Sequence, residues 1–425
     1  MQANYTQYKF GIFFYQIILF LFYKNIHRAI WFSSNGFKFI KMTDNSPSEE
    51  TASVCFFSLH AYSLLTKSPG EIIGGAELQQ VVIGKLLVQE GFRVTFIVLD
   101  HKQENQESIR GITLLKTLPN DYVIKGPFSF IYALLVIIRA FVRTDAKTFY
   151  VRGAGRDAGI AAIYCFFARK RFVFALSSDM DIDGTFYREA RFYERVLQKC
   201  ALVIAQTIVA QTEYQKNLLD STLWKKTVII RNVVISDTAE DKKETLPVIL
   251  WVGKVRPRWK QPEIFLEIAR RIPEAKFQMI GGTSKDLAFY EQIEHEANQI
   301  TNLEFTGFVP FDKIGSYFAK ASILVNTSSN EGFPNTFLQA WSHGIPVVSL
   351  NVDPDEIICR YRLGYHSGSI EQMVSDIRTL LSNSELRNEM GMNGKRYINE
   401  FHSVDSILQE YFHLFLGDQR ISKGN

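Results

Sequence analysis

Apolar, strand-like runs alternate with helical patterns along most of this 425-residue chain. The alternation runs from Val54 to Asn232, breaks in a charged stretch between Ser236 and Thr245, and resumes at Pro247. Alternating units of this kind fold as parallel sheets covered by helices, and a charged break is typical of a linker. The sequence therefore predicts an α/β protein with two doubly wound domains that face each other.

This pattern also suggests where the parts begin and end. We expect a first domain at residues 51–235, a linker at 236–246 and a second domain at 247–400. A last helix, at 401–417, should cross back onto the first domain. Residues 1–50 lie outside the pattern. Their apolar run, Phe10 to Tyr23, is shorter than the roughly 18 residues of a spanning helix. It fits a membrane anchor, an uncleaved signal-like segment or translated sequence upstream of the true start, and composition favours the last.

Composition excludes several classes of protein. A hydrophobic content of 46% and a charged content of 22% are those of an ordinary globular protein. The formal net charge of +4 gives no indication of nucleic-acid binding. The four cysteines lack the paired spacing of metal and redox motifs. We expect a cytoplasmic protein without a metal site.

Basic residues gather between Arg139 and Arg171, beside an apolar helix expected from Phe128 to Val142. Such a region could meet anionic lipid headgroups, which would make the protein peripheral at the inner face of a membrane. The other interpretation is a core helix with a solvated polar end. Apolar runs of this length are usually buried, so the second interpretation is favoured.

The segment after the expected strand Ser322 to Asn326 carries the strongest functional signal. Glu331 lies in a polar loop, and Pro334 stands where a helix would start. The amides and the positive dipole end of a helix start favour phosphate. Asn335 and Gln339, four residues apart, share one face of that helix. The pattern predicts an anion site, although an ordinary crossover with an acidic loop would look similar.

This segment resembles the donor site of family four of the retaining glycosyltransferases (group 1). That site carries two glutamates separated by seven residues. Here Glu331 takes the first position and Gln339 the second. In that family the first acid contacts the donor sugar, the loop amides contact sugar and diphosphate, and the second acid holds the ribose. The resemblance covers roughly residues 53–400 and implies the GT-B architecture. It implies donor-binding roles for Gly253, Gly282, Phe308, Gly332, Phe333, Pro334, Asn335 and Gln339.

A basic loop follows the expected strand Val248 to Val252. Lys254 and Lys260 fall on the two positions of the family's Gly-Arg...Lys element, whose cations neutralise the donor diphosphate. Lysine serves a phosphate as a point charge but lacks the bidentate fork of arginine. For Arg256 and Arg258, a solvated basic loop is an equally good interpretation.

The first domain offers a matching loop. The expected strand Ser53 to Leu59 is followed by Gly74 and Gly75 at the start of a helix that Gly91 closes. Paired glycines let the backbone approach a ligand closely. Their placement resembles the family's amino-terminal loop, which faces the donor phosphates across the cleft.

Two further segments belong to the resemblance and point to the acceptor side. Arg152 follows one expected strand, and Ser178, Asp179 and Asp181 follow the next. Many family members have His-Asp here, whereas this chain has Ser-Asp-x-Asp. We predict that Asp179 positions the acceptor hydroxyl. A capping or turn aspartate is the alternative.

Together these features predict transfer of a glycosyl unit from a nucleotide-diphosphate sugar to a hydroxyl of a glycan or lipid-linked acceptor. Retention of the anomeric configuration follows from the resemblance, as does the expectation of no metal or other cofactor. Glu331, Lys254, Lys260 and Asp179 are the expected catalytic residues. Rival functions are a catalytically impaired donor-binding partner subunit and a sugar-nucleotide epimerase or phosphorylase of similar fold.

Overall fold

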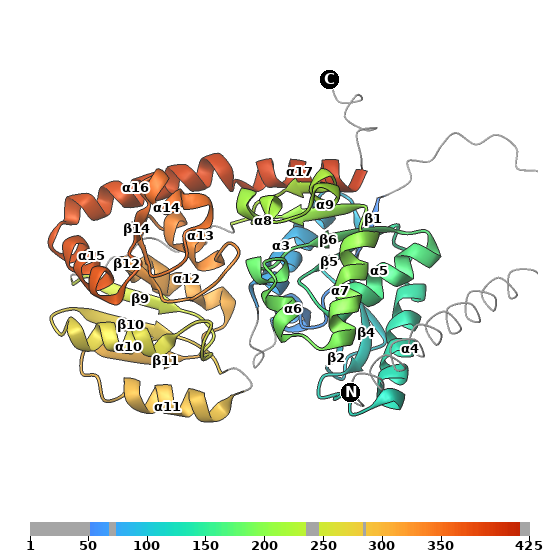
Figure 1. Cartoon of the computed structure of the whole chain (residues 1–425), viewed down its shortest axis with the longest axis horizontal. Coiled ribbons are helices and arrows are strands. Elements are labelled where there is room, and N and C mark those ends of the chain that lie inside the picture. Colours follow the sequence, from blue (N-terminus) through green and yellow to red (C-terminus); the bar gives the residue numbers. More distant parts are fainter. Residues whose placement is uncertain (1–51, 68–73, 235–245, 284–285, 417–425) are drawn as a thin grey trace, which may run out of the picture.

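The computed structural model describes residues 52–67, 74–234, 246–283 and 286–416. They form two α/β domains that lie side by side (Figure 1). Residues 1–50 and nearly all of the expected linker lie outside the described residues. Among the described helices, none is both long and apolar enough to cross a membrane.

The first domain is built on a sheet with the strand order β3-β4-β2-β1-β5-β6-β7-β8. Its strands are β1 (Ser53–Phe57), β2 (Arg93–Asp100), β3 (Gln106–Ile109), β4 (Ile112–Pro119), β5 (Thr148–Arg152), β6 (Arg171–Ala175), β7 (Thr207–Ala210) and β8 (Thr227–Ile229). Neighbouring strands are parallel, except that β3 and β4 form an antiparallel hairpin. Arg110 and Gly111 turn that hairpin with φ of 50° and 82°, as a two-residue turn requires. The expectation of parallel strands throughout is therefore wrong at this edge.

Helices cover both faces of the first sheet. They are α2 (Tyr62–Thr66), α3 (Gly75–Gln89), α4 (Pro127–Arg143), α5 (Arg156–Ala168), η1 (Asp179–Asp181), α6 (Thr185–Glu189), α7 (Phe192–Ile204), α8 (Glu213–Asn217) and α9 (Ser221–Lys225). Helices α4, α5 and α7 share one apolar core with the sheet, and α2 and α3 share the other. Helix α3 ends as expected, because Gly91 has φ of 83° and the Phe92 N–H donates to the Leu87 carbonyl at 3.0 Å.

The second sheet has the order β11-β10-β9-β12-β13-β14, with all neighbours parallel. Its strands are β9 (Val248–Val252), β10 (Lys276–Ile280), β11 (Leu303–Gly307), β12 (Ile323–Asn326), β13 (Val347–Ser349) and β14 (Gly364–His366). The helices are α10 (Pro262–Arg271), α11 (Leu287–Ala297), α12 (Phe311–Lys320), α13 (Asn335–Ser342), η2 (Pro354–Glu356), α14 (Ile357–Arg360), α15 (Ile370–Ser382) and α16 (Ser384–Phe401).

Each sheet reverses its strand order once, between β1 and β5 in the first domain and between β9 and β12 in the second. In open α/β sheets ligands bind outside the carboxyl ends of the strands at such a reversal. The loops singled out in the sequence follow these strands. Chain topology thus directs both sets of candidate residues to the carboxyl edges.

The last helix, α17 (Val404–Leu416), returns to the first domain, and it continues the line of α16 along one edge of the molecule (Figure 1). Ile407 and Tyr411 are buried in the same core as Tyr150 and Phe96. The hydroxyls of Tyr150 and Tyr411 lie 3.3 Å apart. The first domain is therefore completed by residues far along the chain.

Removal of the Tyr411 ring should destabilise the first domain. We expect Tyr411→Ala to lower the free energy of unfolding by about 3–5 kcal/mol, because a fully buried aromatic ring is lost. Tyr411→Phe, which removes only the hydroxyl, should cost about 1 kcal/mol. Urea unfolding of both variants measures this. Equal stability of the two variants would mean that α17 contributes nothing to this core.

Candidate active site

Two loops at the strand reversal of the second sheet are joined into one unit. The Thr327 hydroxyl, which follows β12, donates to the Lys260 carbonyl at 2.7 Å. The Ser329 N–H donates to the Trp259 carbonyl at 2.9 Å. Trp251 supports them from β9, since its Nε1 donates to the Thr327 hydroxyl at 3.0 Å. The loop after β9 is thus positioned by the loop after β12.

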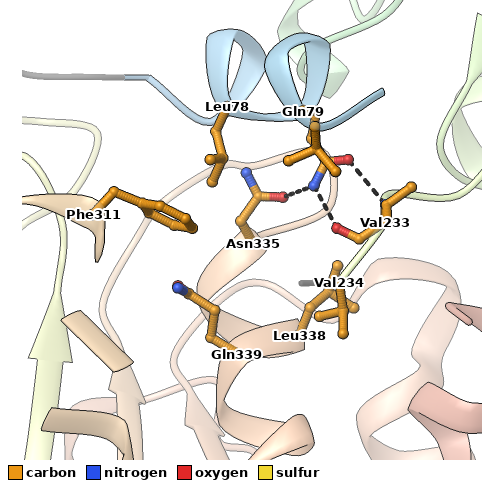
Figure 2. A pocket seen from close by; sticks show the side chains of 9 residues that line it. Leu78, Gln79, Val233, Val234, Phe311, Asn335, Leu338 and Gln339 are labelled. Carbon is orange, nitrogen blue, oxygen red and sulfur yellow. Dashed lines mark hydrogen bonds between the residues drawn. The ribbon is translucent and has the colours of Figure 1, made fainter. Parts of the chain in front are cut away.

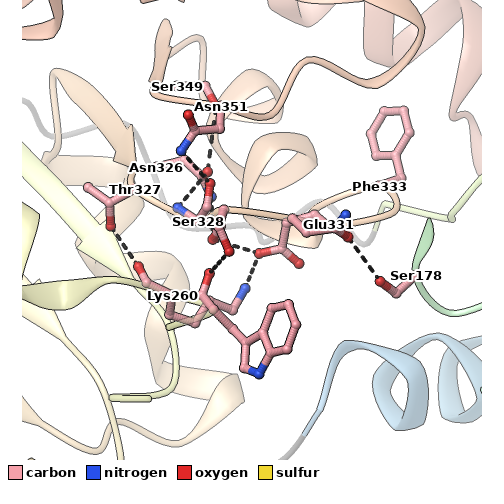
Figure 3. A network of polar contacts seen from close by, with 12 residues as sticks. Ser178, Lys260, Asn326, Thr327, Ser328, Glu331, Phe333, Ser349 and Asn351 are labelled. Carbon is pink, nitrogen blue, oxygen red and sulfur yellow. Dashed lines mark hydrogen bonds and ion pairs between the residues drawn. The ribbon is translucent and has the colours of Figure 1, made fainter. Parts of the chain in front are cut away.

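Glu331 and Lys260, 71 positions apart, form an ion pair within this unit (Figure 3). The Ser328 hydroxyl also donates to Glu331 Oε1 at 2.8 Å, and the Ser328 N–H donates to Asn326 Oδ1 at 3.2 Å. The side chains of Lys260 and Glu331 are 30% and 19% exposed. A carboxylate and an ammonium are therefore held in fixed, partly dehydrated positions beside the start of α13.

Helix α13 begins one residue later than the sequence predicts. Pro334 is its N-cap, with φ of −64° and ψ of 122°, and Asn335 is the first helical residue. The first amides of any α-helix lack intrahelical acceptors and attract anions. The Phe333 ring is buried against His402, at a centroid distance of 5.0 Å. Any contribution of Phe333 to ligand binding therefore comes from its backbone.

Lys254 lies in a cationic part of the cleft. Burial lowers its pKa, and the charges of Arg256 and Lys260 lower it further, while the charge of Glu77 opposes them. Glu77 belongs to the first turn of α3, in the opposite domain. The paired glycines before it were recognised in the sequence, but Glu77 itself was not predicted as a site residue. The cationic loop thus faces a carboxylate across the cleft.

The carboxyl ends of the neighbouring strands β9, β10 and β11 lie beside this loop. A Cβ on Gly281 would lie 2.7 Å from the Gly253 carbonyl oxygen, so the two backbones approach as only glycine allows. The Gly282 carbonyl accepts from the Val255 N–H at 3.0 Å. Phe308, directly after β11, is 40% exposed at this edge. Gly253, Gly282 and Phe308 are therefore brought to one edge of the sheet.

The start of α3 contacts the start of α13. Asn335 Nδ2 donates to the Gly75 carbonyl at 3.1 Å, and a Cβ on Gly75 would lie 2.7 Å from that nitrogen. Gly74, the N-cap of α3, is extended, with φ of −89°. A side chain at position 75 would therefore displace the Asn335 amide from this contact.

Asn335 also belongs to a network of amides between the domains (Figure 2). Gln79 Nε2 donates to Asn335 Oδ1 at 3.0 Å and to the Val233 carbonyl at 2.9 Å. Asn232 Nδ2 donates to the same Asn335 oxygen at 3.2 Å. Arg152 Nη2 donates to Asn232 Oδ1 at 2.7 Å. Asn335, which we assigned to ligand binding, thus also joins the domains, and Arg152 supports this network from within the first domain through Asn232.

Gln339 lines a small cavity beside this network (Figure 2). Its neighbours there include Leu78, Val82, Val234, Phe311 and Leu338, which are apolar. Gln339 and Asn335 both face the cavity, in agreement with their predicted common helix face. The amide therefore lies at the boundary between the two domains.

The first domain contributes the turn after β6. The Ser178 hydroxyl donates to Asn330 Oδ1 at 3.4 Å. A Cβ on Gly332 would lie 3.1 Å from Ser178 Cα and 2.7 Å from Gln215 Nε2. The loop that carries Glu331 is thus in contact with the turn that carries Asp179.

The two aspartates of this turn have different surroundings. Asp179 accepts from Gln215 Nε2 at 2.9 Å. Burial raises the pKa of Asp179 to about 7, and nearby carboxylates add to the shift. Asp181 is buried and accepts from the Ser177 N–H and hydroxyl at 2.7 and 3.0 Å. Its contacts fix the turn, so we interpret Asp181 as a positioning residue.

Comparison with known proteins agrees with this geometry. Residues 246–383 match the family model of Glycosyl transferases group 1. This match covers most of the second domain. An uncharacterized glycosyltransferase of Methanocaldococcus jannaschii is 28% identical over 215 residues, which make up 49% of this chain and 58% of that protein. One subunit of the phosphatidylinositol N-acetylglucosaminyltransferase of Arabidopsis thaliana is 24% identical over 306 residues, or 67% of each protein.

Solved structures extend the likeness to both domains. Sucrose-phosphate synthase from Thermosynechococcus elongatus has a TM-score of 0.71 at 14% identity and covers 86% of this chain and 98% of its own. HepE from Anabaena, in complex with UDP and glucose, has a TM-score of 0.64 at 14% identity. The match covers 85% of this chain and 99% of HepE. The predicted GT-B fold is confirmed. The chain spans about three fifths of the length of the Methanocaldococcus relative.

The raised pKa of Asp179 predicts a pH-dependent change in stability. The folded carboxyl holds its proton more tightly than an unfolded one, whose ordinary pKa is 3.8. The free energy of unfolding should therefore fall as the pH rises from about 4 to about 7. Asp179→Asn, which keeps an acceptor for Gln215, should melt at a higher temperature than the wild type at about pH 8, and this difference should shrink towards pH 4. A difference that does not change with pH would contradict the assignment.

Proposed function

We propose that this protein is a retaining glycosyltransferase of family four. It moves a sugar from a nucleotide-diphosphate sugar to a hydroxyl of a glycan or lipid-linked acceptor, in the synthesis of cell-surface polysaccharide or glycoconjugate. The observation that carries the proposal is the Glu331–Lys260 pair beside the start of α13. This pair lies at the strand reversal of the second sheet, in a loop that contacts the Ser178 turn of the first domain.

The donor diphosphate lies against Lys254, Lys260 and the first amides of α13. Charge develops on the leaving diphosphate during transfer, and positive groups fixed beforehand stabilise it without reorganisation. Lys260 exchanges its contact with Glu331 for the phosphate. Glu331, still held by Ser328, then binds hydroxyls of the donor sugar. No metal ion is needed in this scheme.

The acceptor enters from the side of Asp179. Retention in a single step requires the acceptor oxygen to approach the face of the anomeric carbon from which the phosphate leaves. Ionised Asp179 accepts a hydrogen bond from the acceptor hydroxyl and orients it. A carbon–oxygen bond to the acceptor forms as the bond to phosphate breaks, and the proton passes to the departing phosphate oxygen. Alignment of the two substrates in the cleft supplies much of the acceleration.

The similar proteins support these substrate classes. HepE was solved with UDP and glucose, which are the parts of a nucleotide-sugar donor. The Arabidopsis relative is named for transfer of N-acetylglucosamine to phosphatidylinositol, a lipid acceptor. We extend both classes to this protein as a proposal.

The test is a transfer assay with the full-length protein, labelled sugar nucleotides and lipid-linked or soluble glycan acceptors. We expect a product whose anomeric configuration, measured by NMR, equals that of the donor, and undiminished turnover in EDTA. Glu331→Gln should abolish most of the transfer. A product of inverted configuration would overturn the retaining assignment.

A second candidate is a donor-binding partner subunit without activity of its own. Two departures from the family pattern favour this candidate. Gln339 stands in place of the family's second acid, and the His that many members have beside the position of Asp179 is absent. Binding of sugar nucleotides without transfer, across all donors and acceptors offered, would decide for this candidate.

Substitution of Gln339 by Glu tests whether the residue binds the ribose. A carboxylate accepts hydrogen bonds from two hydroxyls with charge assistance, so donor affinity should be kept or improved by about 1 kcal/mol. The apolar neighbours Leu78 and Phe311 would leave the new charge poorly solvated if no ribose bound there. Calorimetric titration with sugar nucleotides, together with thermal melting, measures both effects. Weaker binding of every donor with a lower melting temperature would show that Gln339 does not bind the ribose.

A further inference from the structure

Helix α4 is apolar on its outer face as well as its inner face. Phe128, Tyr132, Leu135 and Val142 are 88%, 53%, 39% and 61% exposed. Their spacings of four, three and seven residues place them in one stripe along the helix. The opposite side, which includes Phe141, is buried against the sheet. The expectation of a core helix therefore describes only the inner half of α4.

Neighbouring helices extend the apolar surface at both ends of α4. Phe166 and Phe167, at the end of α5, are exposed. Tyr164, two residues before Phe166, links α5 to α4, because its hydroxyl donates to the Phe141 carbonyl at 3.2 Å. At the other end, Phe192 of α7 is 51% exposed beside Tyr193, whose ring meets that of Phe130 at 6.3 Å. Large exposed apolar surfaces usually mark interaction sites.

The same surface is basic. Arg139 and Arg143 are exposed in line with the apolar stripe, and Arg169 is exposed just beyond α5. Helix α4 contains no acidic residue. An apolar stripe flanked by arginines is the pattern of helices that lie in the interface of a bilayer, where anionic headgroups attract the basic side chains.

We propose that the outer face of α4, with the exposed aromatic residues at the ends of α5 and α7, docks on an anionic lipid bilayer. The charge of the surface selects this partner, because arginines beside exposed aromatic rings complement acidic headgroups above an apolar layer. A protein partner is the alternative outcome of the test below.

The position of this surface identifies the class of acceptor, a step that rests on the proposed function. Helices of a parallel sheet begin at the carboxyl edge of the strands, so Phe128 lies at the end of α4 nearer the cleft. Helix α7 begins shortly after η1, the turn that carries Asp179. A bilayer on this face would lie beside the acceptor side of the cleft. The acceptor is therefore a lipid held in the bilayer, whose polar head reaches Asp179.

The experiment is sedimentation of the full-length protein with vesicles of phosphatidylcholine, with or without phosphatidylglycerol. We expect binding to the anionic vesicles alone, and weaker binding at high salt. A triple variant with Phe128→Gln, Tyr132→Gln and Leu135→Gln should bind these vesicles at least about tenfold more weakly. A double variant with Arg139→Gln and Arg143→Gln should be weakened by at least about the same factor. The matched control is Leu287→Gln with Met392→Gln, two exposed apolar residues of the second domain that should not affect binding.

Unchanged binding of the triple variant would overturn the proposal and place membrane contact elsewhere in the chain. Equal binding to neutral and anionic vesicles would overturn it too, and so would no binding at all, which would leave this face to a protein partner. Glu331→Gln should bind vesicles as the wild type does. Loss of docking and loss of transfer are thus measured separately.

Discussion

The other features of the cleft are arranged around the ion pair of Glu331 with Lys260. Both side chains are partly removed from water, so each needs a partner, and Ser328 supplies a second one to the carboxylate. An exposed pair contributes little to stability, whereas removing one member of a dehydrated pair is costly. In the proposed function, a pair fixed in this way supplies the cation that binds the donor diphosphate. The hydrogen bonds of Thr327 to Lys260 and of Ser329 to Trp259, which join the loops after β9 and β12, hold this pair in place.

Polar contacts between the domains keep this pair opposite Asp179. Asn335 of the second domain forms hydrogen bonds with Gly75, Gln79 and Asn232, which all belong to the first domain. Asp355 adds a contact, since its carboxylate accepts from the Glu213 and Tyr214 N–H groups at 2.9 Å each. Its φ of 51° is unusual for a non-glycine residue. Such strained positions persist where surrounding contacts fix them, and they cluster at functional sites.

The sequence predicted those parts of the fold that depend on local patterns. The bounds of β9 agree with the expected range, and those of β12 and α4 differ from theirs by one residue at one or both ends, because strand length and apolar runs are local signals. The meeting of Glu331 and Lys260 follows from topology, since both lie after strands that flank the reversal. The β3–β4 hairpin escaped prediction because its turn, Arg110-Gly111, lacks the usual Asn or Asp before glycine.

The contacts between the domains could not be predicted from the sequence. Gln79 and Asn232 carry no local pattern that distinguishes them from other polar residues, and their partners lie far away along the chain. The inward direction of Asp181 was missed for a related reason. Its spacing from Asp179 is the same whether it faces a ligand or caps its own turn, and only the packing of η1 decides between them.

The central claim is that Lys260 holds the diphosphate of the donor. The most direct test is isothermal titration of nucleoside diphosphates into the wild type, Lys260→Ala and Arg258→Ala. Arg258 lies on the same loop but pairs with Glu189 at 3.0 Å, which makes it a matched control. The account predicts affinity at least about tenfold lower for Lys260→Ala, since a charge-assisted contact is lost, and little change for Arg258→Ala. Equal affinity of the wild type and Lys260→Ala for every nucleoside diphosphate would contradict it.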